Sequence, residues 1–229
     1  MKKFANIYQR AEERKGGKAG LQHWIPDTLT PAQIANIGDD RFLSEMTRCI
    51  FQAGFVWRVI NNKWSQFEEA FWGFEPQKMV MLSPDHIDRL AKDERIVRNR
   101  QKIMSVPHNA QMILDVQKTH GSYAQFVASW PEDDLVNLFL WQKKQGQRLG
   151  GMTGQRLLRN MGKDTFILTA DVARCLIEAG VETKETPSSQ RELKAIQQAF
   201  NTWQQESGLG YTAMSRICAC SVGENYPAQ

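Results

Sequence analysis

The sequence predicts an all-α fold, and the spacing of its apolar residues is the main reason. Apolar side chains recur three and four positions apart, which places them on one face of a helix. Two stretches show this most clearly: Phe42, Leu43, Met46, Cys49, Ile50 and Ala53, and later Leu193, Ile196, Phe200 and Trp203. No stretch alternates apolar and polar residues at the interval of two that is typical of strands.

Residues that begin and end helices divide this pattern into elements. Thr30 and Ser83 each offer a capping hydroxyl before a proline, and Pro131-Glu132-Asp133 after Trp130 places acids in the first turn of another helix. Glycines predict the ends: Gly54, Gly121, Gly162, Gly180 and Gly208. Pro107 interrupts the periodic stretch from Asn99 to His120, which predicts a kinked helix or two helices. At typical helix lengths the chain holds about ten to a dozen helices.

The length and composition suit one domain. The chain has 229 residues, 41% of them hydrophobic, which is enough to bury a sizeable core. We expect a single domain over residues 1–229 with two helical lobes around a cleft. The stripe from Leu193 to Trp203 needs a partner face, so we expect the N- and C-terminal helices to pack together. Residues 182–189 are the most loop-like stretch.

Several classes of protein are disfavoured. No apolar run approaches the roughly 18 residues that cross a bilayer, and the first residues lead into polar helix rather than a signal peptide, so we expect a cytoplasmic protein with no membrane partner. The cysteines are scattered in apolar surroundings, which favours reduced thiols. They are Cys49, Cys175, Cys218 and Cys220. No histidine lies at a zinc-binding interval from them, and we expect no metal and no cofactor.

The basic residues are clustered, although the net charge of +4 is mild. One cluster spans residues 95–102 and the other spans Lys143 to Arg159, where it brackets the glycine-rich turn Leu149-Gly150-Gly151-Met152-Thr153-Gly154. Glycines in such a turn let main-chain N–H groups approach a phosphate, and the next helix adds its unpaired N-terminal donors. The turn therefore suits a nucleic-acid backbone, with Arg156 or Arg159 assisting.

A single carboxylate follows this turn, in Asp171-Val172-Ala173-Arg174. One interpretation is that the turn positions a nucleic acid and Asp171 acts on it. The alternative is purely structural, with Gly150 and Gly151 capping one helix, Gly154 starting another and Asp171 serving as an N-cap.

Two motifs in the first half of the chain resemble the 3-methyladenine DNA glycosylase I family. They are Gln52-Ala53-Gly54-Phe55-Val56-Trp57 and Ile96-Val97-Arg98-Asn99-Arg100-Gln101-Lys102-Ile103. The segment from Leu149 to Arg174 is similar, more broadly, to the helix–hairpin–helix superfamily of DNA glycosylases, in which a glycine hairpin precedes a catalytic aspartate. The two resemblances together cover about residues 40–220 and imply a helix–hairpin–helix glycosylase fold.

The chain departs from the first family at three points. The family's base-recognising glutamate precedes the Gln-Ala-Gly triplet by three residues, where this sequence has Cys49; Glu45 lies one helical turn earlier and could take its place. The family's zinc-binding cysteines and histidines near the termini have no counterparts. That family also generally lacks the hairpin aspartate that Asp171 suggests. The sequence thus resembles a divergent branch of that family.

The resemblance implies a monofunctional base-excision repair enzyme that hydrolyses the N-glycosidic bond of a damaged base, such as an N-alkylated purine like 3-methyladenine, in double-stranded DNA. Asp171 would stabilise the cationic sugar and orient the attacking water, and Trp57 would stack on the extruded base. Glu45, Cys49 and Tyr8 are further candidates for the base pocket. We expect a monomer. The alternative function is a helix–hairpin–helix DNA-binding or damage-sensing protein that has lost catalysis.

Overall fold

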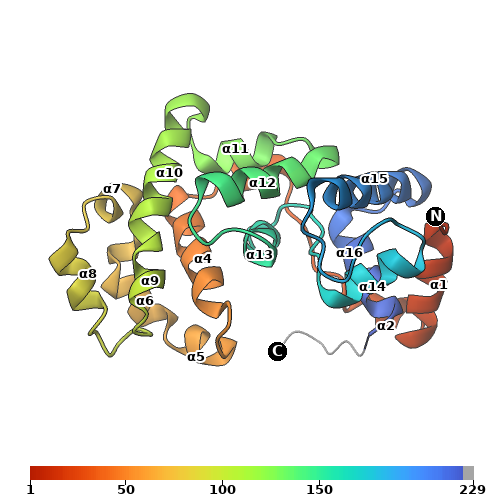
Figure 1. Cartoon of the computed structure of the whole chain (residues 1–229), viewed down its shortest axis with the longest axis horizontal. Helices are drawn as coiled ribbons and strands as arrows, with labels where there is room; N and C mark the ends of the chain where they lie inside the picture. Colours follow the sequence, from red (N-terminus) through yellow and green to blue (C-terminus); the bar gives the residue numbers. More distant parts are fainter. Residues whose placement is uncertain (224–229) are drawn as a thin grey trace. The chain divides into compact units, whose positions relative to one another are not determined.

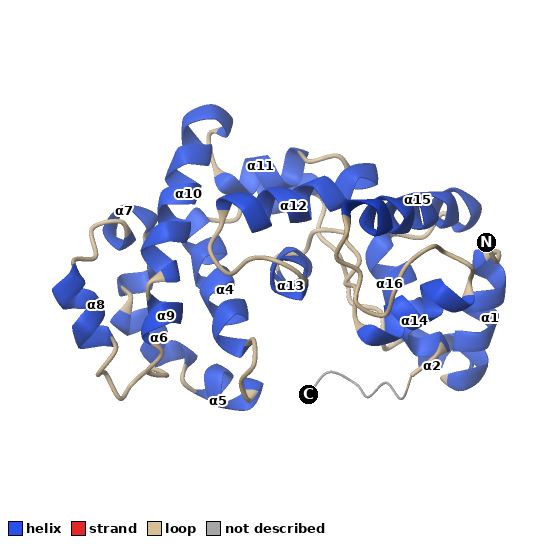
Figure 2. Cartoon of the chain, in the orientation of Figure 1, coloured by secondary structure: helices blue, strands red, loops and turns tan. Residues whose placement is uncertain are grey.

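The computed structural model describes residues 1–223, and it is helical throughout (Figures 1 and 2). Those residues form sixteen α-helices and two short 3₁₀ helices, η1 and η2, with no strand. The all-α prediction is confirmed. The expected number of helices was too low because several have only four to seven residues, which is too short to show a period. No helix in the described part is long and apolar enough to cross a membrane.

The chain divides into two compact units. Unit 1 contains Met1–Thr28, Pro131–Leu138 and the described residues from Asp164 on, whereas unit 2 contains Leu29–Trp130 and Phe139–Lys163. The helices of unit 1 are α1 (Phe4–Arg14), α2 (Gly17–Gln22), η2 (Glu132–Asp134), α14 (Ala170–Glu178), α15 (Gln190–Ser207) and α16 (Tyr211–Ser221). The helices of unit 2 are α3 (Pro31–Ala35), α4 (Asp39–Gln52), α5 (Trp57–Asn62), α6 (Trp64–Ala70), η1 (Trp72–Phe74), α7 (Pro76–Met79), α8 (Pro84–Leu90), α9 (Arg100–Ile103), α10 (Ser105–His120), α11 (Tyr123–Ser129) and α13 (Met152–Asn160). Helix α12 (Leu135–Gln145) begins in unit 1 and ends in unit 2.

In unit 1, α1 packs against α15 and α16, and α14 packs against α16. The stripe Leu193, Ile196, Phe200 and Trp203 is buried. The ring of Phe4 lies 5.6 Å from that of Trp203, whose indole N–H donates to the carbonyl of Lys2 at 3.1 Å. Asp164 accepts the main-chain N–H groups of Tyr211 and Thr212, and so fixes the start of α16.

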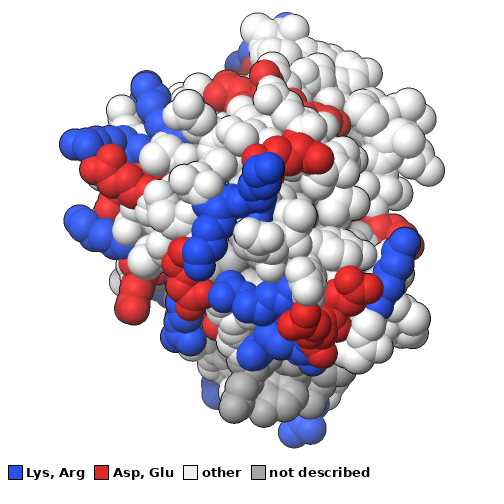
Figure 3. All heavy atoms as spheres, turned by 90° about the vertical axis from the view of Figure 1, so that its right-hand side faces the viewer, with Lys and Arg blue, Asp and Glu red and all other residues white. Residues whose placement is uncertain are grey.

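The surface of unit 1 mixes charges of both signs. Ion pairs join Arg10 to Glu178 and Arg191 to Glu182. Figure 3 shows Lys and Arg interspersed with Asp and Glu across the face that it views. A large basic patch is the usual electrostatic footprint of nucleic-acid binding. The face in Figure 3 has no such patch.

Unit 2 is organised around α4, which packs against α10, α11 and α13. Its periodic apolar residues are buried as the spacing predicts, except Ala53, which is exposed because the helix ends one residue earlier. At the start of α4, the carboxylate of Asp39 accepts the main-chain N–H groups of Tyr123 and Ala124 at 2.9 and 3.0 Å. One side chain thereby caps α11 and joins it to α4.

The capping residues act as their sequence context predicts. Thr30 caps α3 in a reciprocal capping box with Gln33, and Ser83 caps α8. Pro107 lies in the first turn of α10, and the stretch from Asn99 to His120 is two helices, α9 and α10, rather than one kinked helix.

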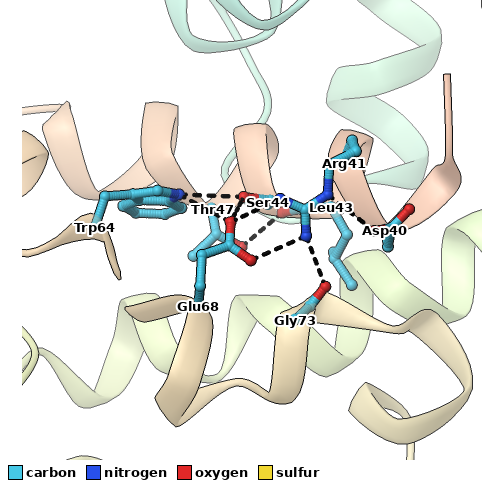
Figure 4. Close-up of polar contacts among 8 residues, drawn as sticks. All are labelled: Asp40, Arg41, Leu43, Ser44, Thr47, Trp64, Glu68 and Gly73. Carbon is cyan, nitrogen blue, oxygen red and sulfur yellow. Dashed lines mark hydrogen bonds and ion pairs between the residues drawn. The ribbon is translucent and has the colours of Figure 1, made fainter. Parts of the chain in front are cut away.

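A left-handed turn in unit 2 is held by a polar network (Figure 4). Trp72, Gly73 and Phe74 have φ values of 47°, 69° and 58°, a conformation that disfavours the two aromatic residues. The guanidinium of Arg41 donates to the carbonyl of Gly73 and, through two nitrogens, to the carboxylate of Glu68. Burial alone would raise the pKa of Glu68, but donors from Arg41, Ser44 and Trp64 lower it. The charged carboxylate therefore anchors the turn to α4 and α6.

Candidate functional site

The glycine-rich turn joins α12 to α13 within unit 2. Gly151 is the N-cap of α13, with φ 60° and ψ −140°, a conformation that is strained for any residue with a Cβ. Gly154 lies in the first turn of α13, where a Cβ would collide with the carbonyl of Leu149. Leu149 is buried beneath the turn and Met152 is exposed, whereas Thr153 is half-buried. The turn thus needs glycine at both positions for its shape.

Asn109 of α10 holds the segment that leads into this turn. Its side-chain amide accepts from the main-chain N–H of Gln147 at 2.7 Å and donates to the carbonyl of the same residue at 3.1 Å. The side chain of Asn109 is buried, and Gln147 is exposed. Arg148, with φ 62°, donates to Gln101 at 2.8 Å. The entry to the turn is therefore fixed from two neighbouring helices.

The two motifs of the first half of the chain meet at the C-terminus of α4. The Nζ atom of Lys102 donates to the carbonyls of Phe51 and Ala53, at 3.0 and 2.7 Å. A cation here satisfies carbonyls that the helix leaves unpaired. Beyond that cap, Phe55, Val56 and Trp57 are exposed by 44%, 63% and 45%. Lys102 therefore has a structural contact, and the chain after it presents an apolar strip that ends at Trp57.

Five residues from α4, α5 and α13 lie close together, and two of them are Trp57 and Cys49. We call them the Trp57 cluster: Glu45, Cys49, Trp57, Arg156 and Asn160. The guanidinium carbon of Arg156 lies 4.6 Å from the centre of the Trp57 ring. Burial lowers the pKa of Arg156.

Glu45 is the acidic residue of the Trp57 cluster, and protein donors surround it. One carboxylate oxygen accepts from Asn160 Nδ2 at 2.7 Å and from Cys49 Sγ at 3.4 Å; the other lies 3.3 Å from Arg48. Burial raises the pKa of the Cys49 thiol, and the charge of Glu45 raises it further. Cys49 is therefore a neutral S–H donor to Glu45.

Asp171 lies in unit 1, at the second position of α14. Thr169 is the N-cap of that helix, because its hydroxyl accepts from the N–H of Val172, so Asp171 is a first-turn residue and not the cap. Its half-buried carboxylate packs against Gly223, where a Cβ would collide with it. Arg14 donates to the carbonyls of Cys220 and Gly223 and holds this segment in place. Within residues 1–223, Asp171 forms no ion pair.

The structure brings some of the candidate residues together. Trp57, Glu45, Cys49 and Arg156 lie in one cluster of unit 2, on α4, α5 and α13, and α13 begins at the glycine turn. Arg159, half-buried, lies one turn further along α13. Asp171 and the half-buried Tyr8 of α1 belong to unit 1. Among residues 1–223 no group of three His, Cys, Asp or Glu side chains could hold a metal ion.

Sequence reasoning missed two members of the surroundings of Glu45. Arg48 could have been found, because a residue three positions away on a helix is a neighbour. Asn160 could not, since 115 positions separate it from Glu45 and only the packing of α13 on α4 joins them.

Solved structures with a similar fold are DNA glycosylases. An 8-oxoguanine DNA glycosylase from Methanocaldococcus jannaschii is 15% identical, with a TM-score of 0.56 over 92% of this chain and 91% of that one, which indicates a shared fold. The 3-methyladenine DNA glycosylase I of Staphylococcus aureus is 25% identical, with a TM-score of 0.51 over 66% of this chain and 90% of that one. The fold is thus that of the helical DNA glycosylases.

The sequence comparisons define the family. DNA-3-methyladenine glycosylase 1 of Escherichia coli (strain K12) is 29% identical over 79 residues, which are 34% of this chain and 42% of that protein. The match thus spans less than half the length of this curated relative. The model of the methyladenine glycosylase family matches residues 34–169. The chain belongs to the methyladenine glycosylase family.

Proposed function

We propose that the protein is a monofunctional DNA glycosylase that hydrolyses the N-glycosidic bond of an alkylated purine in double-stranded DNA. The observation that carries this proposal is the match of the family model to residues 34–169, which include α4, the Trp57 cluster and the glycine turn. An alkylated purine is a good leaving group because it is positively charged. The protein must therefore mainly extract the nucleotide and stabilise the cationic sugar.

Asp171 is the catalytic residue in this proposal. Its carboxylate would stabilise the sugar cation and orient or deprotonate the attacking water. Two features support the assignment: it forms no ion pair within residues 1–223, and its packing against Gly223 limits where its carboxylate can lie. A carboxylate that is tied to no other charge remains available to a reacting group.

The turn from Leu149 to Gly154 would bind the DNA backbone, through main-chain N–H groups at the start of α13. Phosphate contacts of this kind fix position without reading sequence, so affinity should fall steeply with salt. The support is the strained glycine geometry at Gly151, which sets the direction of those N–H groups.

The environment of Lys163, the lysine that lies between the turn and Asp171 in the sequence, supports hydrolysis without strand cleavage. A lysine that forms a Schiff base needs an accessible, unprotonated amine. Lys163 is 2% exposed, and its Nζ atom donates to the carbonyl of Trp130 at 2.9 Å. It is therefore engaged in stabilising the C-terminal end of α11.

The test is release of free base from DNA treated with a methylating agent. We expect the wild-type protein to release methylated purines without nicking the strand and without forming an adduct that borohydride traps. Asp171→Asn should slow release by about 10² or more while DNA affinity stays within a few-fold, because the substitution removes a charge and keeps the shape. Glu185→Asn, an exposed change in the same unit, is the control.

Either of two results would contradict the proposal. Full activity in Asp171→Asn would show that another group stabilises the sugar. Binding of damaged duplexes by the wild-type protein with no release of any base would favour the non-catalytic DNA-binding function.

A further inference from the structure

A hollow of about 300 Å³ lies in unit 2, between α6, η1, α8 and the segment that follows α8. Its volume is at the lower end of the range of small-molecule sites. None of its lining residues belongs to the Trp57 cluster or to the glycine turn. We call it the Trp72 hollow, and its polar and aromatic lining consists of Glu69, Trp72, His86, Arg89, Asp93 and Arg95.

Trp72 lines this hollow in a backbone conformation that rarely suits a tryptophan. Its φ of 47° belongs to the left-handed region, where glycine, asparagine and aspartate are the usual residues. Packing accounts for only part of the choice, since Trp72 is 47% exposed. Strained residues cluster at functional sites, where the surrounding structure holds a group in position for a ligand. An exposed ring at such a position is therefore better explained by a ligand than by the fold.

Contacts of the neighbouring residues set the orientation of the rings in the Trp72 hollow. Arg41 donates to the carbonyl of Gly73 at 2.9 Å and so holds the turn beside Trp72 (Figure 4). The imidazole of His86 lies at 84° to the indole of Trp72, with the ring centres 5.8 Å apart. The hydroxyl of Ser83 lies 2.9 Å from Nδ1 of His86 and fixes that ring as well. A flat ligand therefore meets two rings that are already positioned, which lowers the entropic cost of binding.

The Trp72 hollow also contains a cation that the rest of the described chain leaves unpaired. Its two acidic residues, Glu69 and Asp93, lie 3.9 and 2.7 Å from Arg95, which neutralises much of their charge. Arg89, in the last turn of α8, is the other arginine. Among residues 1–223 the guanidinium of Arg89 forms no ion pair and donates no hydrogen bond. A guanidinium binds a phosphate through two parallel N–H groups, so Arg89 favours a phosphate ligand.

A flat aromatic surface beside an unpaired guanidinium matches the two parts of a nucleotide. Any base can stack on tryptophan, because every base has a π-face, and the phosphate is the natural partner of the guanidinium. We propose that the Trp72 hollow is a nucleotide-binding site, in which Trp72 stacks on the base and Arg89 binds the phosphate. The nucleotide comes either from a free mononucleotide or from a single strand. This proposal does not rest on the glycosylase function.

Calorimetric titration with deoxyadenosine monophosphate, deoxyadenosine and inorganic phosphate tests both contacts. We expect the wild-type protein to bind the nucleotide at least about ten-fold more tightly than the nucleoside or the phosphate, because only the nucleotide makes both contacts. Trp72→Leu removes the flat ring and should weaken nucleotide binding about ten-fold, whereas Trp72→Tyr should keep most of it. Arg89→Met should reduce the affinity for the nucleotide to that for the nucleoside.

NMR of protein labelled at the tryptophan indole nitrogens locates the site. The signal of Trp72 is the one that is missing from Trp72→Leu, and it should shift when the nucleotide is added to the wild-type protein. The controls are Met81→Ala and Lys118→Met, two exposed changes outside the hollow that should leave nucleotide affinity unchanged. An unshifted Trp72 signal, equal affinity for nucleotide and nucleoside, or unchanged affinity in Trp72→Leu or in Arg89→Met would each overturn the proposal.

A short single strand of deoxyadenosine nucleotides distinguishes the two sources. Tighter binding of the strand than of the mononucleotide, with the same losses in Trp72→Leu and Arg89→Met, would assign the site to a nucleic-acid strand. Equal or weaker binding of the strand would assign it to a free mononucleotide. These measurements involve no base release, so failure of the glycosylase function would leave their outcome unchanged.

Discussion

Cys49 is a neutral thiol because burial and the neighbouring carboxylate of Glu45 both raise its pKa. Its role in the free protein is to donate an S–H to Glu45, which also accepts from Asn160. The position is therefore part of a small buried polar network, in which every donor matters because few waters can replace it. A carboxylate at residue 49 would sit beside Glu45 in the same network.

This arrangement gives a prediction for two substitutions. Cys49→Ala should lower the free energy of unfolding by about 1 kcal/mol, the ordinary cost of a small buried change. Cys49→Glu should lower it by about 2 kcal/mol or more at pH 8, because two buried carboxylates repel each other. Repulsion raises the pKa of the pair in the folded state, so the loss should be smaller at pH 5, where protonation relieves it. Denaturant unfolding at the two pH values measures the difference, and an identical loss at both would contradict the prediction.

At the residue scale, the sequence does not predict which partners Lys102 and Arg156 contact. The motif that contains Lys102 is visible in the sequence, but the sequence alone does not show what the lysine contacts. Its contacts with the carbonyls of Phe51 and Ala53 depend on a tertiary approach across about 50 positions. The same holds for Arg156. Its place after the glycine turn predicts a phosphate contact, whereas in the structure its guanidinium lies over the ring of Trp57.

At the scale of the element, caps and glycines could be predicted and short helices could not. Thr30 and Ser83 act through side chains that bond within three residues, so the sequence alone contains the information. Helices α7 and α9, with four residues each, are too short to show a face and form because neighbouring helices hold them. Local signals therefore predict helix boundaries better than they predict the number of helices.

The geometry of the turn at Gly151 gives a prediction for DNA binding. Gly151→Val places a β-branched residue at φ 60°, which should reorient the N–H groups at the start of α13 and weaken binding several-fold to all duplexes alike. Gly208→Val is a matched control, because Gly208 has φ 68° and, like Gly151, has open space around its α-carbon. Gly151→Val should lose more stability, because φ 60° with ψ −140° suits glycine alone, whereas φ 68° with ψ 7° at Gly208 is the ordinary left-handed region. Fluorescence anisotropy with several duplexes measures affinity, and unchanged binding by Gly151→Val would remove the turn from the proposed interface.

The capping box at the start of α15 gives a prediction for pH. Main-chain and side-chain donors of Ser189 and the N–H of Ser188 lower the pKa of Glu192 to about 2. A depressed pKa contributes stability that is present above the ordinary value of 4.5 and is lost as the pH falls toward 2. Glu192→Gln should therefore be less stable than the wild-type protein at pH 7, and the difference should shrink below pH 4.5. Thermal unfolding across that range tests it, with Glu185→Gln as an exposed control; a difference that does not change with pH would contradict the assignment.

At the scale of the whole molecule, unit 1 combines segments that are far apart in the chain. Helix α1 buries Phe4, Ile7 and Ala11 against helices near the other end of the described chain. The stripe from Leu193 to Trp203 could be predicted as a buried face, because its period of three and four is local. Which segments make up each of the two units could not be predicted, since that depends on which helices meet rather than on any residue spacing.

Phe4 tests how much α1 contributes to unit 1. Its side chain is 1% exposed and packs on Trp203, so Phe4→Ala should lower the local stability of unit 1 by about 3–5 kcal/mol. Hydrogen exchange should show faster exchange in α15 and α16 than in the wild-type protein, with little change in α4 and α10. Gln9→Ala, an exposed change on the same helix, is the control. Equal loss of protection in all four helices would show that the two units unfold together.

The packing of α1 has a further consequence, which concerns synthesis on the ribosome. Lys2 and Trp203, which share a hydrogen bond, are 201 positions apart. At about 5–20 residues per second, the partners of α1 emerge about 10–40 s after α1 itself. Throughout that interval, Phe4 and Ile7 lack the surface that buries them in the folded protein, while most of unit 2 is already outside the ribosome. The nascent N-terminal helix therefore stays without its partners for longer than α14, which also packs on α16.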